Sequence, residues 1–472
     1  MENQKGSNSL EHFFEIEGFK EKANFLSDLL HQYSVEYAIS HTGSIKGNVN
    51  EKNRSGQSYL YKKLGMESEV LEIKMRDKIH ISYLQMATDT ALKRYPYLTV
   101  KLVEKDGDFY LVENPIPVIV KEMSTLRSLG SSRVNYHLID ITCEKTTMFI
   151  SFHHALCDGE GIKPFVETLL YYYCLYRYNM RKKRQKPVSK IRLANDPLLE
   201  GETNDPFLIR YETSGKEYPK ISRDGFALDE NVKTDDSQDY RYEIRINHAA
   251  FLSFAKKNNA TPAIAVGLIM NQAIRNLYPN FDKPVICNIA LSMRAALGCE
   301  NTFKNCVRSM AFHYTKALSE RPLKEQATEY RRILNEQREP DYVKTEANEQ
   351  IGLFEKLDQL DSYEKKQKIM SFFEEMLLNT YIISYLGQFN LGYNEKYIHS
   401  INLYNSGVTG LGINVIAAGQ YFLLGFKQSF PSDRYVCEFA AVLKGYGLDC
   451  EVSDCIPFTT PTDSLIKRKK SC

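Results

Sequence analysis

The residues best suited to chemistry lie in one short stretch, FISFHHALCDGEGI, at positions 149–162. Two adjacent histidines, His153 and His154, follow an apolar run, and Asp158 and Gly159 lie four and five residues after the second histidine. A neutral imidazole has an ordinary pKa of ~6.5 and can act as a base near pH 7. It could take the proton from a hydroxyl or amine that attacks a thioester carbonyl, and could then return this proton to the leaving thiolate.

Each of these residue types also has an ordinary structural explanation. A lone histidine in a strand is usually a core or surface residue, an aspartate before a helix is usually an N-cap, and a glycine at a turn needs no function. The joint pattern H-H-x-x-x-D-G, however, should arise by chance only about once in a thousand chains of this composition. The combination therefore favours a functional site.

A strand must deliver the histidines and a helix must follow the glycine. Side chains alternate across a strand, so Met148, Ile150, Phe152 and His154 are predicted to share one face while His153 points to the other. We therefore do not expect the two histidines to bind one metal ion together, and we predict no metal site. From Gly159 onward, apolar residues recur at helical spacing, at Ile162, Phe165, Val166, Leu169 and Leu170.

Strand and helix patterns interleave on both sides of this stretch. A helix is expected at 81–95 because its amphipathic pattern stops before Pro96, and two alternating runs form a hairpin around 106–107. In the second half, Thr261 and Pro262 should cap and open a buried helix. Charged helices are expected at about 321–338 and 345–379. This order predicts an α/β fold with a mixed sheet, flanked by helices, in each half.

Composition divides the chain into five segments. Prolines, RKKRQK and TDDSQD interrupt the pattern between the two halves, which marks a connection. We predict a partly helical N-terminal extension, an N-terminal half with the histidine motif, a linker, a C-terminal half and a tail, at 1–57, 58–180, 181–238, 239–450 and 451–472 respectively.

Charge and hydropathy exclude several classes of protein. The 472 residues carry a net charge of +2, which provides no field for nucleic acid. No apolar run reaches the ~18 residues of a membrane helix, and the N-terminus lacks the apolar core of a secretory signal. Ten cysteines without a C-x-x-C pair fit a reducing cytoplasm better than zinc or disulfides. We therefore expect a cytoplasmic protein with no nucleic-acid partner and no transmembrane segment.

Three other motifs are weaker. The spacing of GVTGLG at 407–412 is the reverse of a dinucleotide loop, so a hairpin loop is the better interpretation. The basic runs at 181–186 and 467–470 are interpreted as solvated, although they could contact the phosphates of coenzyme A or an acidic surface.

The histidine motif resembles a known signature. HHALCDG at 153–159 is similar to the H-H-x-x-x-D-G motif of the chloramphenicol acetyltransferase-like superfamily. That group includes peptide-synthetase condensation domains, BAHD acyltransferases, alcohol acetyltransferases and polyketide-associated acyltransferases. The resemblance extends over about 58–450, and its further segments are 91–113, 258–274, 289–307 and 384–391.

The resemblance implies two similar half-domains that meet at a central cleft or tunnel, with the base in the middle. His154 would be the general base, His153 a supporting residue, Asp158 a structural residue held by an arginine, and Gly159 the turn. Three further positions would line or support the site: Arg294, Asn305 and Ser384.

The sequence also departs from the family pattern. Lys304 replaces the glycine before Asn305, and Tyr385 replaces the asparagine that often follows Ser384. The D-F-G-W-G signature is missing, and FNLGY at 389–393 is only distantly similar to it. The two substitutions bear on acceptor choice or crossover geometry, whereas the missing signature favours the alcohol acetyltransferase or lipid acyltransferase branches.

The resulting hypothesis is an acyltransferase that moves an acyl group from a thioester to an alcohol or amine by direct attack. The co-substrate would be acyl-CoA or acyl-phosphopantetheine, with no tightly bound cofactor, and the acceptor a small molecule, a lipid or a secondary metabolite. Two alternatives stay open. One is a free-standing condensation-type enzyme that is supplied by a carrier protein. The other is a non-catalytic binding or scaffolding member. The intact set of His154, Asp158 and Gly159 argues against this second alternative.

Overall fold

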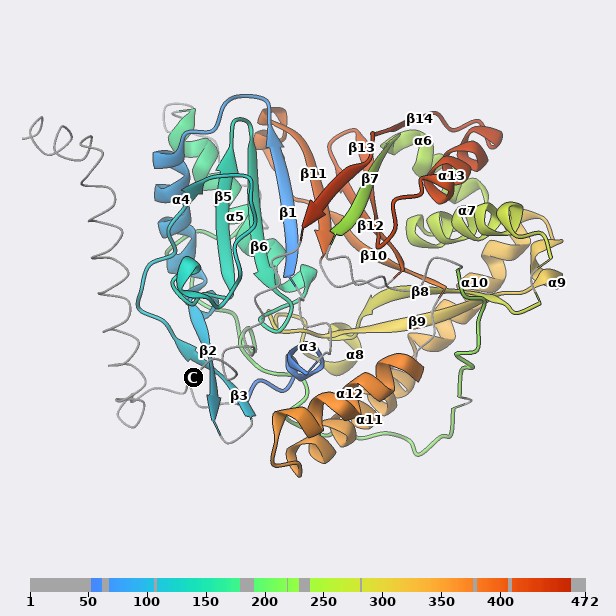
Figure 1. The fold of residues 1–472 in the computed structure, drawn as a ribbon, viewed down its shortest axis with the longest axis horizontal. Helices are drawn as coiled ribbons and strands as arrows, with labels where there is room; N and C mark the ends of the chain where they lie inside the picture. Colours follow the sequence, from blue (N-terminus) through green and yellow to red (C-terminus); the bar gives the residue numbers. More distant parts are fainter. Residues whose placement is uncertain are drawn as a thin grey trace, which may run out of the picture.

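The computed structural model has two lobes side by side (Figure 1). It describes residues 52–61, 68–105, 108–178, 191–218, 220–228, 238–280, 282–376, 380–405 and 410–459. Several predictions therefore lie outside the described residues: most of the N-terminal extension, both basic runs, the hairpin turn at 106–107, the first residues of GVTGLG and the end of the tail.

The first lobe is built on a mixed five-stranded sheet in the order β11-β1-β6-β5-β4. Its strands are β1 (Ser68–Met75), β4 (Lys121–Glu122), β5 (Ile139–Glu144), β6 (Thr147–His153) and β11 (Ile398–Asn405). Helices α4 (Ile81–Arg94) and α5 (Gly159–Arg177) share one buried apolar cluster with β1, β5, β6 and β11. Shorter elements of this half are α3 (Gln57–Leu60), η1 (Pro96–Leu98), η2 (Ser132–Val134) and the hairpin of β2 (Val100–Lys105) and β3 (Asp108–Glu113).

Strand β11 joins the lobes because it comes from late in the chain but pairs with β1 at the edge of the first sheet. In the chain it follows β10 and the short helix η5 (Gly392–Tyr397), and it precedes β12. Both β10 and β12 lie in the second sheet. One strand from the segment 239–450 thus completes the sheet of the first lobe.

The second lobe contains a mixed sheet of eight strands. These are β7 (Gln238–Asn247), β8 (Val285–Ser292), β9 (Val307–Tyr314), β10 (Tyr381–Gln388), β12 (Leu411–Ala418), β13 (Tyr421–Gln428), β14 (Cys450–Val452) and β15 (Ile456–Thr459). The accompanying helices are α6 (His248–Lys257), α7 (Pro262–Leu277), α8 (Arg294–Leu297), α9 (Lys316–Ser319), α10 (Leu323–Gln337), α11 (Pro340–Asp358), α12 (Tyr363–Met376) and α13 (Arg434–Gly445). The predicted α/β class, with a mixed sheet in each half, is confirmed.

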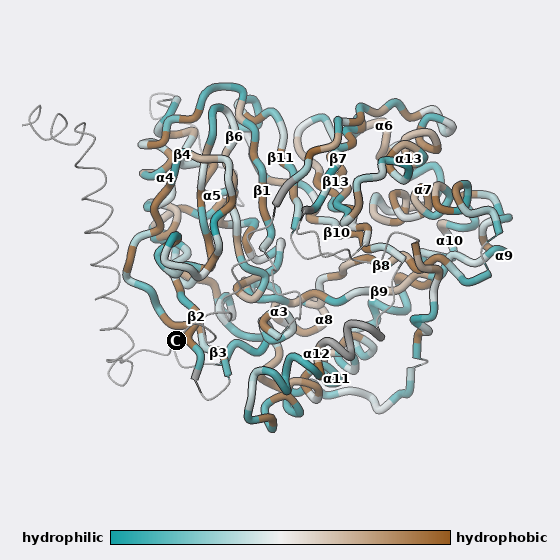
Figure 2. The backbone as a smooth tube through the Cα atoms, in the orientation of Figure 1, coloured by the Kyte–Doolittle hydropathy of each residue, from teal (hydrophilic) through white to brown (hydrophobic). Residues whose placement is uncertain are grey.

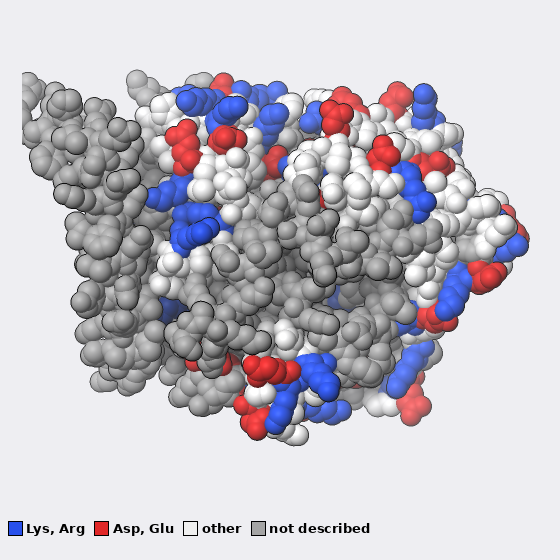
Figure 3. Space-filling model, in the orientation of Figure 1, with Lys and Arg blue, Asp and Glu red and all other residues white. Residues whose placement is uncertain are grey.

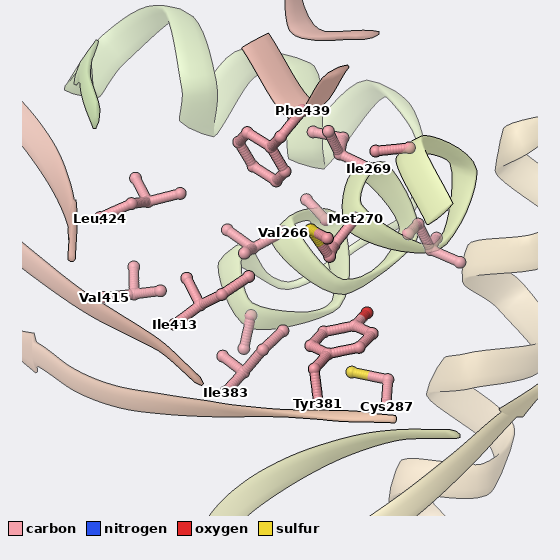
Figure 4. Packing of buried hydrophobic residues seen from close by; sticks show 14 of the residues in the cluster. Val266, Ile269, Met270, Cys287, Tyr381, Ile383, Ile413, Val415, Leu424 and Phe439 are labelled. Carbon is pink, nitrogen blue, oxygen red and sulfur yellow. The ribbon is translucent and has the colours of Figure 1, made fainter. Parts of the chain in front are cut away.

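Helix α7 forms the centre of the second core. Its N-cap is Thr261, whose side chain accepts a hydrogen bond from the backbone N–H of Ile264, and Pro262 is its first residue, as the sequence predicts. Figure 4 shows Val266 of α7 near Ile413 on β12, and Ile269 of α7 near Phe439 on α13. Brown, apolar stretches lie along the strands and helices of both lobes in Figure 2.

One predicted helix is in fact two. The segment 345–379 was expected to form one charged helix, but α11 ends at Asp358 and α12 begins at Tyr363. The hydroxyl of Ser362 accepts a hydrogen bond from the backbone N–H of Lys365 at 3.3 Å, which is the geometry of a helix N-cap. A new helix therefore starts where the charge pattern alone showed no break.

The surface agrees with the small net charge. Basic and acidic side chains are interspersed over the described part of the face in Figure 3. No helix among the described residues is long and apolar enough to cross a membrane.

Candidate active site

His154 lies directly after the end of β6, in the turn that leads to α5. The strand ends at His153, and the helix begins at Gly159 with Asp158 as its N-cap. A carboxylate oxygen of Asp158 accepts a hydrogen bond from the backbone N–H of Gly161 at 2.8 Å. The turn thus places the imidazole at the end of the first sheet, where segments of the second lobe reach it.

Asn305, from the segment before β9, holds the imidazole of His154 from the second lobe. Its side-chain N–H donates to the backbone carbonyl of His154, and its Oδ1 lies 2.6 Å from Nδ1 of the same histidine. A carbonyl oxygen can only accept, so the amide nitrogen must face it and Oδ1 must face the ring. Nδ1 therefore carries the proton that Oδ1 accepts, and Nε2 is the ring nitrogen left for chemistry.

Two residues that sequence reasoning missed complete the surroundings of this ring. Glu69 Oε1 lies 3.3 Å from His154 Nε2, and Tyr59 stacks on the imidazole with the ring centres 3.8 Å apart and the planes 8° from parallel. Neither residue belongs to a motif. Glu69 is brought in by the register of β1 against β6, in which it pairs with Phe152, two positions before His154.

His153 lies in a different environment from His154. Its side chain is buried, and its Nδ1 accepts a hydrogen bond from the backbone N–H of Ala155 at 2.9 Å. Burial, together with the neighbouring His154, lowers the pKa of His153 to about 3, so the ring is neutral at pH 7. The two histidines therefore have separate surroundings, and His153 supports the turn.

Arg294 at the start of α8 binds Asp158 in the buried interior. Its Nη2 donates to Asp158 Oδ1 at 2.7 Å, and its Nε and Nη2 donate to the backbone carbonyls of Thr302 and Lys304 at 3.0 and 2.9 Å. The backbone N–H of Cys306 donates to the other carboxylate oxygen of Asp158 at 2.9 Å. Burial acts to lower the pKa of Arg294, but Asp158 outweighs this effect and the net shift is upward.

The segment 302–306 lies against the first turn of α5. A Cβ atom added to Gly161 would lie 1.8 Å from the carbonyl oxygen of Phe303, so only glycine fits there. Gly159 is under less constraint: its φ is not positive, and its nearest neighbour would be the side chain of Leu386 at 3.1 Å. The backbone of the segment 302–306 thus leaves no room for a side chain at position 161.

Comparisons with known proteins address the fold. No protein-family model and no curated protein matches the sequence. Among solved structures, TRI101 of F. sporotrichioides, complexed with coenzyme A and T-2, matches with a TM-score of 0.55 and 11% identity, over 85% of this chain and 99% of that one. Polyketide synthase associated protein 5 from Mycobacterium tuberculosis matches with a TM-score of 0.53 and 12% identity, over 85% and 98%. TRI3 trichothecene 15-O-acetyltransferase from Fusarium sporotrichioides matches with a TM-score of 0.52 and 12% identity, over 84% and 93%.

The chain has the chloramphenicol acetyltransferase-like fold. This fold was expected from the resemblance of the histidine motif and of further segments to that superfamily, and the matches cover 85% of the chain. Identities of 11–12% establish the architecture alone.

Two further positions singled out in the sequence, Lys304 and Ser384, lie in different surroundings. Lys304 is buried, and its Nζ lies 3.8 Å from Asp205 Oδ2, so the structure accommodates this charge next to Asn305. Ser384 lies on β10 beside Asn414 of β12 and is half-buried. No contact joins Ser384 to His154 in the described part of the chain, whereas Arg294 and Asn305 both belong to the site. Within the same part, no group of three His, Cys, Asp or Glu side chains could hold a metal ion.

Proposed function

We propose that this protein is an acyltransferase that moves an acyl group from a thioester of coenzyme A to an alcohol or amine, with His154 as general base. The observation that carries the proposal is the pair of contacts between Asn305 and His154. Because Asn305 accepts the proton on Nδ1, the unprotonated Nε2 lies on the side of the ring that faces away from Asn305. A general base needs one unprotonated ring nitrogen in a fixed orientation, and the two contacts from Asn305 support this role for His154.

The reaction would proceed by direct attack. The acceptor oxygen or nitrogen forms a bond to the thioester carbonyl carbon while His154 Nε2 takes its proton. The carbon–sulfur bond then breaks, and the imidazolium returns the proton to the thiolate. Asn305 stabilises the imidazolium in between, because its Oδ1 accepts from the Nδ1–H throughout.

The ion pair of Asp158 and Arg294 would act on the geometry and not on the proton. Both charges are satisfied within the protein, because Asp158 accepts hydrogen bonds from Arg294 and from the backbone N–H of Cys306. Their role would be to hold the turn and the segment 302–306 together, so that His154 and Asn305 stay aligned. A base displaced by ~1 Å loses much of its rate advantage.

The donor and acceptor classes are supported by proteins of the same fold. TRI101 was solved with coenzyme A and T-2, and TRI3 is described as a trichothecene 15-O-acetyltransferase. This supports a coenzyme A thioester as donor and a small secondary metabolite as acceptor. An acyl group on the phosphopantetheine arm of a carrier protein would present the same thioester, so it belongs among the donors to be tested.

The test is release of free thiol from a panel of acyl-CoAs, with alcohols and amines as acceptors and with carrier-bound acyl groups as additional donors. We expect thiol release that depends on an acceptor and that is lost in His154→Ala. The matched control is His80→Ala, which removes an exposed histidine at the start of α4. No thiol release with any donor, or wild-type turnover by His154→Ala, would refute the proposal.

A further inference from the structure

We propose that Cys299 and Cys306 are a site of reversible oxidation, at which a hydroperoxide forms a disulfide that displaces His154 from its aligned position. Both thiols are free, and they lie seven positions apart in the connection between α8 and β9. Their sulfur atoms are 3.6 Å apart. Formation of the disulfide concerns these two residues alone, whereas its effect on activity rests on the proposed acyl transfer.

The two sulfur atoms are close enough to bond after a small movement. A disulfide has an S–S length of about 2.05 Å, so the two atoms must approach each other by roughly 1.5 Å. The bond would close a short loop, 299–306, within one segment of the second lobe. No movement of one lobe relative to the other is therefore needed.

The two thiols differ in exposure and in acidity. Cys299 is half-buried and can be reached from solvent, whereas Cys306 is buried. The S–H of Cys306 donates to the sulfur of Cys299, and this contact lowers the pKa of Cys299, as does the nearby Arg294. The same contact raises the pKa of Cys306. Because a thiolate reacts with peroxides and a thiol does not, Cys299 is oxidised first and Cys306 completes the bond.

The reaction consumes one hydrogen peroxide for each disulfide. The thiolate of Cys299 attacks one peroxide oxygen, the O–O bond breaks, and a sulfenic acid and hydroxide form. The hydroxide takes up the proton that Cys299 gave off on ionisation. The sulfur of Cys306 then bonds to the sulfenic sulfur, the S–O bond breaks, and the departing hydroxide takes the Cys306 proton. Two thiols are thus oxidised, and the peroxide is reduced to two water molecules.

Hydrogen bonds fix the backbone on both sides of the sulfur contact. The N–H of Cys299 donates to the carbonyl of Arg294 at 3.0 Å, and its carbonyl accepts from the N–H of Thr302 at 3.1 Å. The carbonyl of Cys306 accepts from the N–H of Met293 at 2.8 Å. Neither cysteine is at the end of a free loop, so both backbones share the approach of the sulfurs.

The movement at Cys306 leads directly to the base. The backbone N–H of Cys306 donates to Asp158 Oδ2 at 2.9 Å. Asn305, which holds the imidazole of His154, is the residue directly before Cys306. A misplacement of ~1 Å at a catalytic group can cost about 100-fold in rate, and part of the approach is taken up at Cys299. We therefore expect kcat of the disulfide form to be lower by roughly 10-fold to 100-fold.

The disulfide is measured without reference to activity. Trypsin separates the two cysteines, because it leaves Cys299 in the peptide 295–304 and Cys306 in the peptide 305–308. The full-length protein is treated with hydrogen peroxide, free thiols are blocked with iodoacetamide, and the digest is analysed by mass spectrometry. We expect the two peptides to be joined after treatment and separate again after dithiothreitol. Oxidation of the exposed Cys437 shows that the peroxide dose is sufficient.

Activity is measured as kcat for thiol release, after the peroxide or dithiothreitol has been removed. The wild type should lose activity on oxidation and regain it after dithiothreitol. Cys299→Ser should have the wild-type kcat before treatment and keep it afterwards. Cys450→Ser is the matched control, because it removes another half-buried cysteine of the second lobe, and it should remain as sensitive to peroxide as the wild type.

The two measurements separate the possible failures. Absence of the joined peptides at a dose that oxidises Cys437 overturns the inference. Joined peptides with an unchanged kcat, or an equal loss of activity in Cys299→Ser, overturn the effect on His154. If the fully reduced protein releases no thiol from any donor, the proposed function fails, and the joined peptides still decide whether the oxidation site exists. Joined peptides together with a loss of activity that Cys299→Ser abolishes support the inference.

Discussion

A single methyl group added at Gly161, a residue that takes no part in the reaction, should strongly lower the activity. In Gly161→Ala, the new Cβ would lie 1.8 Å from the carbonyl oxygen of Phe303, whereas ordinary contacts begin near 3.4 Å. The opposing atom belongs to the backbone, so no side-chain rotation can relieve the clash. Either the first turn of α5 or the segment 302–306 must move by roughly 1.5 Å, a distance set by packing at close-packed density.

That displacement would reach the base through Asn305, which is two residues beyond Phe303 and holds His154 by two hydrogen bonds. A misplacement of ~1 Å at a catalytic group can cost about 100-fold in rate. We therefore expect kcat for thiol release to fall about 100-fold in Gly161→Ala. The helix content should be unchanged, because alanine is the best helix former and keeps the backbone N–H that Asp158 accepts.

Two other glycines give a graded control series. Gly445 ends α13 with nothing within 4 Å of an added Cβ, so Gly445→Ala should have wild-type kcat. At Gly159 the added Cβ would meet only the side chain of Leu386 at 3.1 Å, which can move, so a decrease of a few-fold is expected. Wild-type kcat in Gly161→Ala, or equal losses at all three positions, would refute this account of how the lobes align the base.

The remaining predictions concern the motif itself. His154→Ala should lower acyl transfer by about 10²–10⁴-fold without loss of the fold, as measured by thiol release and circular dichroism; near-normal turnover would exclude the general-base role. Asp158→Ala leaves Arg294 with less compensation and α5 without its cap, so it should lower both activity and the free energy of unfolding, the latter by about 3–5 kcal/mol in urea titrations. Lost activity at unchanged stability would instead indicate a chemical role. His153 has its folded pKa lowered to about 3, below the ~6.5 of an unfolded histidine, so its contribution to stability is full above pH ~6.5 and is lost as the pH falls toward 3. His153→Gln should flatten this acid limb in unfolding measurements, and an unchanged pH dependence would argue against a neutral buried ring.

The sequence predicted the fold well because the fold depends on local patterns. Both the N-cap at Thr261 and the end of α4 before Pro96 can be predicted from the residues next to them in the sequence. The break between α11 and α12 was missed because a single serine, Ser362, outweighs the continuous charge pattern around it. Crossover of β11 into the first sheet was equally hidden, since pairing with β1 depends on contacts between distant parts of the chain.

The candidate site could be predicted only where a motif carries it. His154 and Asp158 stand in one short signature, and Arg294 and Asn305 were reached through resemblance. Glu69 carries no such signal: only the register of β1 against β6 shows that it faces the base. Tyr59 likewise could not be predicted, because it stacks on an imidazole 95 positions away and no sequence pattern indicates such a contact.

The activity should depend on the assembly of the two lobes, because each lobe contributes residues to the site. The base and Glu69 belong to the first lobe, whereas Asn305, Arg294 and Phe303 reach them from the second. The first lobe alone would therefore present an imidazole with neither a fixed tautomer nor a compensated Asp158. Because a buried charge that loses its partner is strongly destabilising, the ion pair between Asp158 and Arg294 links the closure of the lobes to the alignment of His154. Stability and catalysis should thus be lost together when this interface is disturbed.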